Sequence, residues 1–468
     1  MGSRPMDWIR DTLYKILAKI DRKSADINLG MSGKMWEALV TWDNLYRNEP
    51  LWKSTTVHPL NTPATIASKF AKMVTLEMEC NISGSPRADY IAEQISPLLH
   101  DIREKVERAC AMGGMAFKPY ISGDRVAIDS VPYGNFFPTS YNSNHELVGG
   151  MFVARKTIGS IWYTRIESHE FYGNEHRIRN YAYRSSVETS IGSPCSLQEV
   201  AEWADIQPDS RIVNVERPLF AHFKIPIANN IDPECPLGVS VFSKAIKTIR
   251  DLDEQYSRFI WEFKGGELAI SATDDYFLHN SNGQIFLDDH EKRLYRLLET
   301  PTDNSNLFEV FSPAFRDTSL LNGFNAILRQ IETQCGMSFG TLSNVQNVER
   351  TATETIHAKQ EMYTTVNDIQ KSLQTALENL IYAIDVLTTI GNLAPNGNIE
   401  TSFYWDDSII VDKDVKRQQF WQYVSAGKFP FWKFLVDFEG YTEEDAKALA
   451  AEANSSMPRM FGDVNATS

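Results

Sequence analysis

The chain has few cysteines and no long apolar run, and these absences exclude several classes of protein. Its five cysteines lie far apart and none has a CxxC spacing. A disulfide framework or a zinc site is therefore not expected. No apolar run reaches the ~20 residues of a membrane-spanning helix, and charged side chains interrupt every candidate signal-peptide core near the N-terminus. We expect a protein that is made and kept in a cytosol, with no membrane contact.

The sequence also lacks the short motifs of nucleotide-binding and hydrolytic enzymes. It contains no GxxxxGK[ST] phosphate loop, no GxSxG and no HExxH. The best candidate for a metal or acid–base site is Glu167 with His169 and His176, because Glu167 and His169 would face the same side of a strand. Such a pair more often marks the solvated side of a sheet. A metal- or carboxylate-dependent hydrolase is therefore only the alternative, and we expect no catalytic site, metal or cofactor.

Positive charge is scarce as well. The chain has 46 Lys and Arg against 61 Asp and Glu, a formal net charge of −15. Tight wrapping of nucleic acid needs cations that displace counterions from phosphates, so it is not expected. The same balance suits a wall past which DNA slides without sticking, although solubility is the default explanation for surface carboxylates. The length of 468 residues predicts two to four domains.

The most informative segment covers residues 315–390. It predicts an amphipathic helix over 315–334, a loop over 336–350, and then a helix of ~40 residues that would be roughly 60 Å long. Ordinary globular enzymes rarely need a helix of that length. A long helix joined to a shorter one by an exposed loop suggests a part that is repeated around a ring.

The loop over 336–350 is rich in hydrogen-bonding side chains but uncharged until Glu349 and Arg350. A loop this long is uncommon unless it is functional or disordered; a plain connector between helices is the open alternative. Thr351 and Glu354 predict a capping box at the start of the long helix. We therefore expect a firm downstream anchor and a free loop tip.

A second amphipathic helix is predicted over 240–263, with an apolar stripe that faces a neighbour. Between this helix and the one over 315–334 lies a β-rich insert, 267–313, with nine acidic and three basic residues and thus a net charge of −6. Its strand-like segments cover 267–272, 284–287 and 307–312. The stripe residues expected to meet a partner subunit are Ile246, Ile249, Leu252, Tyr256 and Phe259, with Phe324 and Leu328 on the second helix.

The rest of the chain completes an α+β fold. Residues 7–22 predict an amphipathic helix that docks on the protein's own body rather than on a membrane. Further helices are predicted over 31–46, 62–77, 91–112, 414–426, 430–438 and 442–454. Period-two alternation predicts a sheet of five or six strands from 116–131, 148–156, 162–172 and 177–184. Residues 400–411 predict a strand pair, and periodicity ends after 455.

Several short motifs, in their order and spacing, resemble those of tailed-phage portal proteins of the type found in siphophages of Gram-positive hosts. The resemblance extends along nearly the whole chain. The most specific motifs are Ile331-Glu-Thr-Gln-Cys-Gly336 followed by Ser338, and Glu349-Arg-Thr-Ala-Thr-Glu354. The others are Trp42-Asp-Asn-Leu-Tyr46, Lys69-Phe-Ala-Lys-Met73, Gly113-Gly-Met-Ala-Phe-Lys118, Tyr163-Thr-Arg-Ile-Glu-Ser-His169, Pro218-Leu-Phe220, Ile225-Pro-Ile-Ala-Asn-Asn230, Pro236-Leu-Gly-Val-Ser240 and Leu252-Asp253.

The resemblance implies a portal fold with named parts. Residues 1–236 would form the wing, 237–264 and 314–335 the two stem helices, and 265–313 the clip. Residues 336–350 would form the tunnel loop, 351–411 the long helix and return strands, 412–455 a helical crown and 456–468 a disordered tail. The implied DNA-facing residues are Phe339, Thr341, Ser343, Asn344, Gln346, Asn347 and Arg350. The implied clip contacts are Asp274, Asp275, Asp288 and Asp289.

The resemblance also implies a function that is not enzymatic. Such a protein forms a ring, usually of twelve subunits, at one vertex of the capsid in the virion, and is assembled in the host cytoplasm. The ring passes double-stranded DNA during packaging and ejection and connects head to tail. Its implied partners are the terminase large subunit, a head–tail adaptor, and the major capsid and scaffolding proteins. A related head–tail adaptor or other virion ring component is the structural alternative, and it would lack the helix–insert–helix order.

Overall fold

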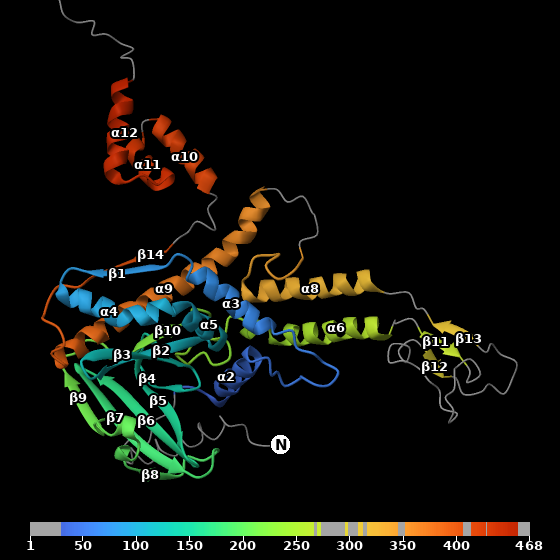
Figure 1. Cartoon of the computed structure of the whole chain (residues 1–468), viewed down its shortest axis with the longest axis horizontal. Coiled ribbons are helices and arrows are strands. Elements are labelled where there is room, and N and C mark those ends of the chain that lie inside the picture. The colour runs from blue at the N-terminus through green and yellow to red at the C-terminus, as the bar shows by residue number, and fades with distance from the viewer. Residues whose placement is uncertain are drawn as a thin grey trace, which may run out of the picture. The chain divides into compact units, whose positions relative to one another are not determined.

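The computed structural model describes residues 30–265, 269–272, 295–297, 308–311, 316–344, 352–405, 413–426 and 428–456. These residues divide into two compact units, one ending at Tyr404 and one beginning at Trp405. Figure 1 shows that the first unit mixes helices with sheets and that the second consists of helices. The predicted α+β class is confirmed. The helix predicted over 7–22 lies outside the described residues.

Four helices open the described chain: α2 (Gly33–Tyr46), α3 (Thr62–Val74), α4 (Pro86–His100) and α5 (Ile102–Met112). The predicted single helix over 91–112 is wrong, because α4 and α5 meet at Asp101, whose backbone leaves the helical region. Helix α4 also begins earlier than predicted, since the Ser85 side chain accepts from the Ala88 amide at its N-terminus. The predicted end of α5 at Gly113 is confirmed by its φ of 87°.

The strands form two main sheets rather than the single predicted one. The larger sheet has the order β4 (Phe136–Tyr141), β5 (Leu147–Ile158), β6 (Ile161–Tyr172), β7 (Glu175–Ser185) and β8 (Ser193–Cys195), with β9 (Asp209–Val213) also on β7. The predicted segment 116–131 is a hairpin of β2 (Gly114–Ser122) and β3 (Arg125–Pro132). It joins β10 (Ala221–Lys224) in a three-stranded sheet. Strand prediction thus located the segments but not their pairing.

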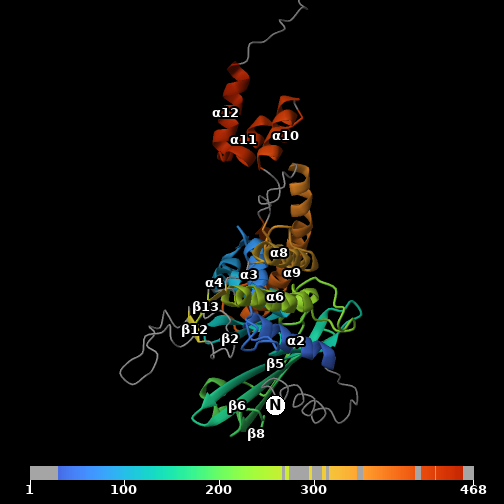
Figure 2. The ribbon, with the colours of Figure 1, turned by 90° about the vertical axis from the view of Figure 1, so that its right-hand side faces the viewer.

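The first unit is layered around the three-stranded sheet. Helices α4, α5 and the long α9 (Ala352–Ile390) pack on one side of it, and the six-stranded sheet lies on the other, as Figures 1 and 2 both show. Phe136, Phe152 and Phe220 pack together between the two sheets. The predicted long helix is confirmed at 39 residues. Its C-terminal half is buried in this unit along Ile369, Leu373, Leu377 and Leu380.

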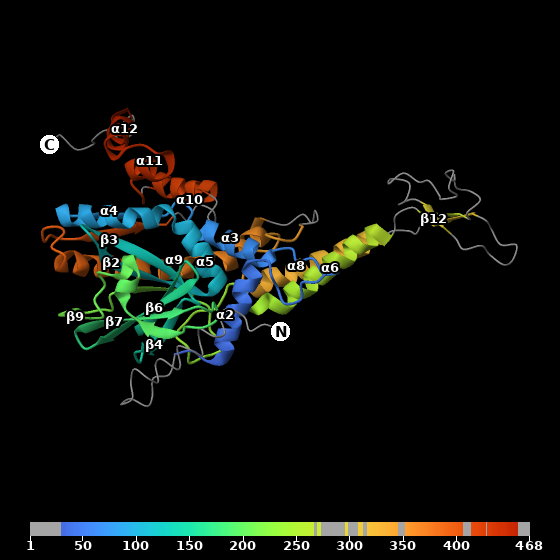
Figure 3. The same cartoon turned by 60° about the horizontal axis from the view of Figure 1, so that its bottom comes forward.

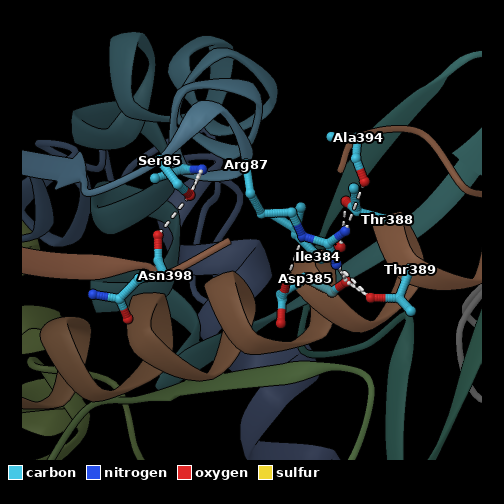
Figure 4. A network of polar contacts seen from close by, with 9 residues as sticks. Ser85, Arg87, Ile384, Asp385, Thr388, Thr389, Ala394 and Asn398 are labelled. Atoms are coloured by element: carbon cyan, nitrogen blue, oxygen red, sulfur yellow. Dashed lines mark hydrogen bonds and ion pairs between the residues drawn. The ribbon is translucent and has the colours of Figure 1, made fainter. Parts of the chain in front are cut away.

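The end of α9 is held by one buried arginine from α4 (Figure 4). The Arg87 guanidinium donates to the Asp385 side chain at 2.7 Å and to the Asp385 carbonyl at 2.5 Å. It also donates to the Ala394 carbonyl at 3.0 Å and to the Thr389 hydroxyl. A cation at the C-terminal end of a helix complements the helix dipole. Arg87 therefore ties the first helices of the chain to the far end of the long one.

Two helices leave this body as an antiparallel pair. The chain enters the first one past Gly238, where a Cβ would lie 2.3 Å from the Gly113 carbonyl oxygen, so the two backbones are in direct contact. A short 3-10 turn, η3 (Ser243–Ala245), precedes α6 (Ile246–Gly265), and α8 (Asp317–Cys335) packs along α6. Figure 3 shows the pair extending away from the sheets. Both predicted amphipathic helices are confirmed, although α6 proper begins only at Ile246.

A small sheet lies between α6 and α8 in the sequence. Strand β11 (Ala269–Ala272) is central, with β12 (Tyr295–Leu297) parallel to it and β13 (Phe308–Phe311) antiparallel. The strands predicted over 267–272 and 307–312 are confirmed. The strand predicted over 284–287 lies outside the described residues, and β12 was not predicted.

The remaining predictions concern the C-terminal part of the chain. Strand β14 (Glu400–Tyr404) pairs with β1 (Glu79–Ser83), so the first half of the predicted strand pair finds its partner far away in the sequence. The three predicted helices are confirmed as α10 (Lys413–Ser425), α11 (Phe431–Glu439) and α12 (Glu443–Ser456). The rings of Phe420 on α10 and of Phe434 and Phe438 on α11 pack together, and α12 packs on α11. Residues 406–412 and 457–468 lie outside the described ranges.

Candidate functional site

The helix pair α6–α8 buries part of the stripe that the sequence predicted at a subunit interface. Ile249 and Leu252 are fully buried within their own chain, so they stabilise the subunit itself. The rings of Tyr256 and Phe324 contact each other across the pair, with their centroids 6.2 Å apart. Assigning Ile249 and Leu252 to a subunit interface was therefore wrong. Periodicity identified the apolar face of α6 but not its neighbour.

Helix α6 also contacts the loop between α2 and α3 in the same chain. The Asp253 carboxylate accepts from Trp52 Nε1 at 2.8 Å and from the Leu60 amide at 3.0 Å. Ser257, one turn later, accepts from the His58 amide at 2.9 Å. Burial raises the pKa of Asp253, while these donors oppose that effect. Sequence analysis missed this anchor, although an acid within an apolar stripe is a signal for it.

Other stripe positions remain available on the helix pair. Ile246, Phe259 and Leu328 are partly exposed. More apolar surface lies on residues that the stripe did not include: Trp261 is 72% exposed and Leu321 is 48% exposed. A bidentate ion pair between Arg316 and Glu262, at 2.9 and 2.7 Å, joins the two helices near these positions. The ion pair thus links α6 to α8, and the helix pair still exposes large apolar side chains to solvent.

The start of the loop after α8 is folded back onto that helix. Gly336 ends α8 with a φ of 67°, and the Met337 amide returns to the Glu332 carbonyl at 2.8 Å. The Ser343 hydroxyl donates to the Glu332 carboxylate at 2.8 Å, and Ser343 is only 6% exposed. The Asn344 amide donates to Asn325 Oδ1 at 2.9 Å. Residues 336–344 of the loop are therefore held by α8, whereas residues 345–350 lie outside the described ranges, so the predicted free tip stays a prediction.

The predicted DNA-facing residues have different surroundings. The guanidinium of Arg329 lies over the Phe339 ring at 4.8 Å. Thr341 is partly buried and its hydroxyl donates to the Ser338 carbonyl at 2.5 Å, whereas Asn344 is exposed. Gln346, Asn347, Arg350 and the Thr351 capping position lie outside the described residues. So do Asp274, Asp275, Asp288 and Asp289.

A family model described as "Phage portal protein, SPP1 Gp6-like" matches residues 101–459. That match spans α5 to α12 and includes both main sheets, the α6–α8 pair, the loop and α9. The chain belongs to this family of phage portal proteins. A search of curated proteins found no match.

Proteins of this family are structural rather than enzymatic. The family also implies that the portal protein is a capsid component of the virion. The family implies a homo-oligomeric ring associated with capsid and DNA. No helix in the described part of the portal protein is both long and apolar enough to cross a membrane. The match begins at residue 101, so α2, α3 and α4 precede it.

The candidate hydrolase site of the portal protein is a buried network between its two sheets. His169 and His176 are almost completely buried, so placing Glu167 and His169 on a solvated sheet face was wrong. Glu167 accepts from the Lys118 amine at 2.5 Å and from His169 Nε2 at 3.0 Å. His169 Nδ1 in turn contacts His176 Nε2 at 2.9 Å. The described residues contain no group of ligands that could hold a metal ion.

The charges of this network follow from its partners. Burial opposes ionisation of Glu167, but its bonds to His169, Lys118 and Arg165 lower its pKa well below the ordinary value. Burial lowers the pKa of both histidines, so they stay neutral. Because His169 Nε2 donates to Glu167, its Nδ1 must accept from His176 Nε2. The cluster is thus a buried ionic and hydrogen-bonded core that links the two main sheets.

Proposed function

We propose that this portal protein forms a ring at one capsid vertex, through which double-stranded DNA enters during packaging and leaves during ejection. The observation that carries the proposal is the family match across the order α6, small sheet, α8, loop and α9. This order gives one subunit a paired-helix stem, a clip at its end and a loop at its base. A head–tail adaptor would lack this order. A hydrolase finds no support in the buried Glu167 network.

The ring would close through the exposed apolar surface of the helix pair. Trp261 on α6 and Leu321 on α8 are large, exposed and apolar, which favours burial against a neighbouring subunit. A face that meets a different face on the next subunit generates a closed ring when the rotation closes. Twelve subunits are the number proposed from the family. In this arrangement Ile249 and Leu252 hold the stem to its own wing.

The loop would line the channel with polar but mostly uncharged groups. Thr341 and Asn344 belong to its described half, with Gln346 and Asn347 following in the sequence. Neutral side chains contact DNA without releasing many counterions, so they do not hold it tightly. Arg350 is the single Lys or Arg between residues 336 and 350. Such a loop suits passage of DNA rather than retention.

The two ends of the ring would bind different partners. We assign the acidic segment with Asp274, Asp275, Asp288 and Asp289 to docking of the terminase large subunit during packaging and of a head–tail adaptor afterwards. The helices α10, α11 and α12 would form a crown towards the capsid interior. The wing would contact the major capsid and scaffolding proteins. Assembly would take place in the host cytoplasm, and the ring would remain in the virion.

The proposal is tested by the assembly state and by a loop variant. Mass photometry and negative-stain images of the purified protein should show closed rings with a central hole, and a monomer at every concentration would overturn the proposal. Deletion of residues 340–347 should preserve rings but reduce packaged DNA. Because Gly340, Leu342 and Ser343 bind Glu332, a shorter deletion of 345–347 is the cleaner variant. Loss of rings in that variant would make the loop an assembly element instead.

A further inference from the structure

The Glu332 side chain is a buried carboxylate near the end of α8, only 1% exposed. Its Oε1 accepts from the Leu342 amide at 2.5 Å and from the Ser343 amide at 2.8 Å. Its Oε2 accepts from the Gly340 amide at 3.2 Å and from the Ser343 hydroxyl at 2.8 Å. All four donors come from the first half of the loop. The Glu332 carboxylate is thus hydrogen-bonded to three residues of the loop.

The bonding partners of Glu332 distinguish it from an ordinary buried ion pair. Within the described ranges, no Lys or Arg forms an ion pair with Glu332. A buried charge is costly unless it is well hydrogen-bonded, and a carboxylate makes stronger bonds to N–H donors than a neutral acceptor does. While the loop covers Glu332, these four donors replace the water that would otherwise solvate its carboxylate. Loop conformation and the burial of Glu332 depend on each other.

Other contacts hold residues 336–344 against the neighbouring helices. Gly336 has a left-handed backbone, and a Cβ there would lie 3.1 Å from the Thr365 hydroxyl of α9. The Ser338 amide points at the Met362 sulfur of α9 at 3.4 Å. The Asn344 amide is held by Asn325 of α8 at 2.9 Å. The folded segment 336–344 therefore sits against both α8 and α9, with Glu332 at its centre.

We propose that Glu332 is a positioning residue, a latch that fixes the loop against α8 and so sets where Thr341 and Asn344 stand in the channel. The inference rests on the proposed function, because the loop matters to DNA only if the ring is a conduit. Glu332 itself contacts no DNA, since its carboxylate is enclosed by the loop. The hydrogen bonds of the latch, between the Glu332 carboxylate and the loop amides, all lie within one subunit.

The first test is amide hydrogen exchange on assembled rings. In Glu332→Gln the amide nitrogen would face a donor, so half of the acceptor capacity is lost. Exchange at Gly340, Leu342 and Ser343 should rise at least about tenfold, while the number of subunits in the ring stays the same. Ser343→Ala, which keeps the carboxylate and removes one donor, should give a smaller rise and serves if Glu332→Gln does not fold. The exposed Gln330→Ala on the same helix should change nothing. Unchanged exchange in Glu332→Gln would overturn the latch.

The second test separates the latch from the proposed function. Phage carrying Glu332→Gln should package less DNA than phage carrying Gln330→Ala, with normal rings in both. If deletion of 345–347 lowers packaging but Glu332→Gln, with its loosened loop, does not, the latch is overturned and the conduit stands. If both variants form rings and package normally, the loop has no part in DNA passage and the latch is overturned, whereas the conduit is overturned only by a protein that forms no closed rings.

Discussion

At the scale of single residues, the buried network of Lys118, Glu167, His169 and His176 shows how neighbours decide the role of a side chain. Register places Glu167 opposite Phe152 on β5 and Asn180 on β7, so its side of β6 faces the space between the two sheets. There it meets Lys118 from β2. Breaking such a buried pair costs more than the pair contributes. Residues of the types found in catalytic sites here form hydrogen bonds and an ion pair that connect the two sheets.

The histidine pair predicts a pH dependence of stability. The pKa of His176 is lowered to about 2, first by burial and then by the neighbouring His169. Below its unfolded pKa of about 6.5, the unfolded chain therefore binds a proton that the folded chain does not, and stability falls by up to ~1.4 kcal/mol per pH unit from this residue. Melting temperatures between pH 7.5 and 5.0 should decline less steeply in His176→Gln than in the unaltered protein. Parallel declines would show that His176 titrates in the folded state.

At the scale of elements, the long helix α9 depends on contacts at its C-terminal end. Its C-terminal end is enclosed by the Arg87 guanidinium, which is 2% exposed and reaches Asp385, Thr389 and Ala394. These bonds add a donor to the Asp385 carbonyl near the end of α9 and pair the Ala394 carbonyl just beyond it. The planar fork of arginine matches them, whereas a lysine would supply the charge without the geometry. The helix is thus fastened where the chain turns back to β14.

Replacing Arg87 should therefore loosen this end of α9. Arg87→Ala should lower the free energy of unfolding by about 3 kcal/mol, because it removes the cation from the partly buried Asp385 carboxylate and the donor from the Ala394 carbonyl. Arg87→Lys should lose less. Hydrogen exchange at Gly391 and Leu393 measures the local effect.

Arg217→Ala is the matched control. Arg217 also binds α9, at Asn379, but it is exposed. Its loss should therefore lower the free energy of unfolding by less than about 0.5 kcal/mol. Equal effects of Arg87→Ala and Arg217→Ala would contradict the anchoring role.

At the scale of the whole molecule, the helix pair α6–α8 has two kinds of apolar residue with different roles. Ile249 and Leu252 are buried within the subunit, whereas Trp261 and Leu321 are exposed in the single chain. The first kind stabilises a monomer, and the second would contribute to stability if a neighbouring subunit covered it. A ring accounts for both.

Charge placed at the two kinds of position should give different defects. Trp261→Asp combined with Leu321→Asp should leave secondary structure and subunit stability close to normal and prevent closed rings, because a charge would be buried at the interface. Ile249→Asp should destabilise the subunit by about 3–5 kcal/mol or prevent folding. Ser319→Asp, an exposed polar position on α8, is the control for added charge. Mass photometry and circular dichroism distinguish these outcomes. Closed rings in the double variant would exclude this surface as the interface.

Much of the order of elements followed from local pattern. Helices α6, α8 and α9 and strands β5 to β7 were predicted because each carries a long periodic run of apolar residues. The division at Asp101 was not predicted, since one amphipathic pattern continues through both α4 and α5. Strand β12 was missed because three residues are too few to establish a period. Local pattern detects an element only when the element is long enough to repeat.

The family and the class of fold were available from the sequence alone, because they rest on short motifs and on periodicity, which are properties of neighbouring residues. The partners of each face were decided only by the tertiary structure. Asp253 meets Trp52, Glu332 gathers Ser343, and Glu167 meets Lys118 across gaps of 201, 11 and 49 residues. A burial pattern says that a side is covered but carries no information on what covers it. The partner of each face is set in the folded chain, where the packing that buries the most apolar surface and pairs the most polar groups is the most stable.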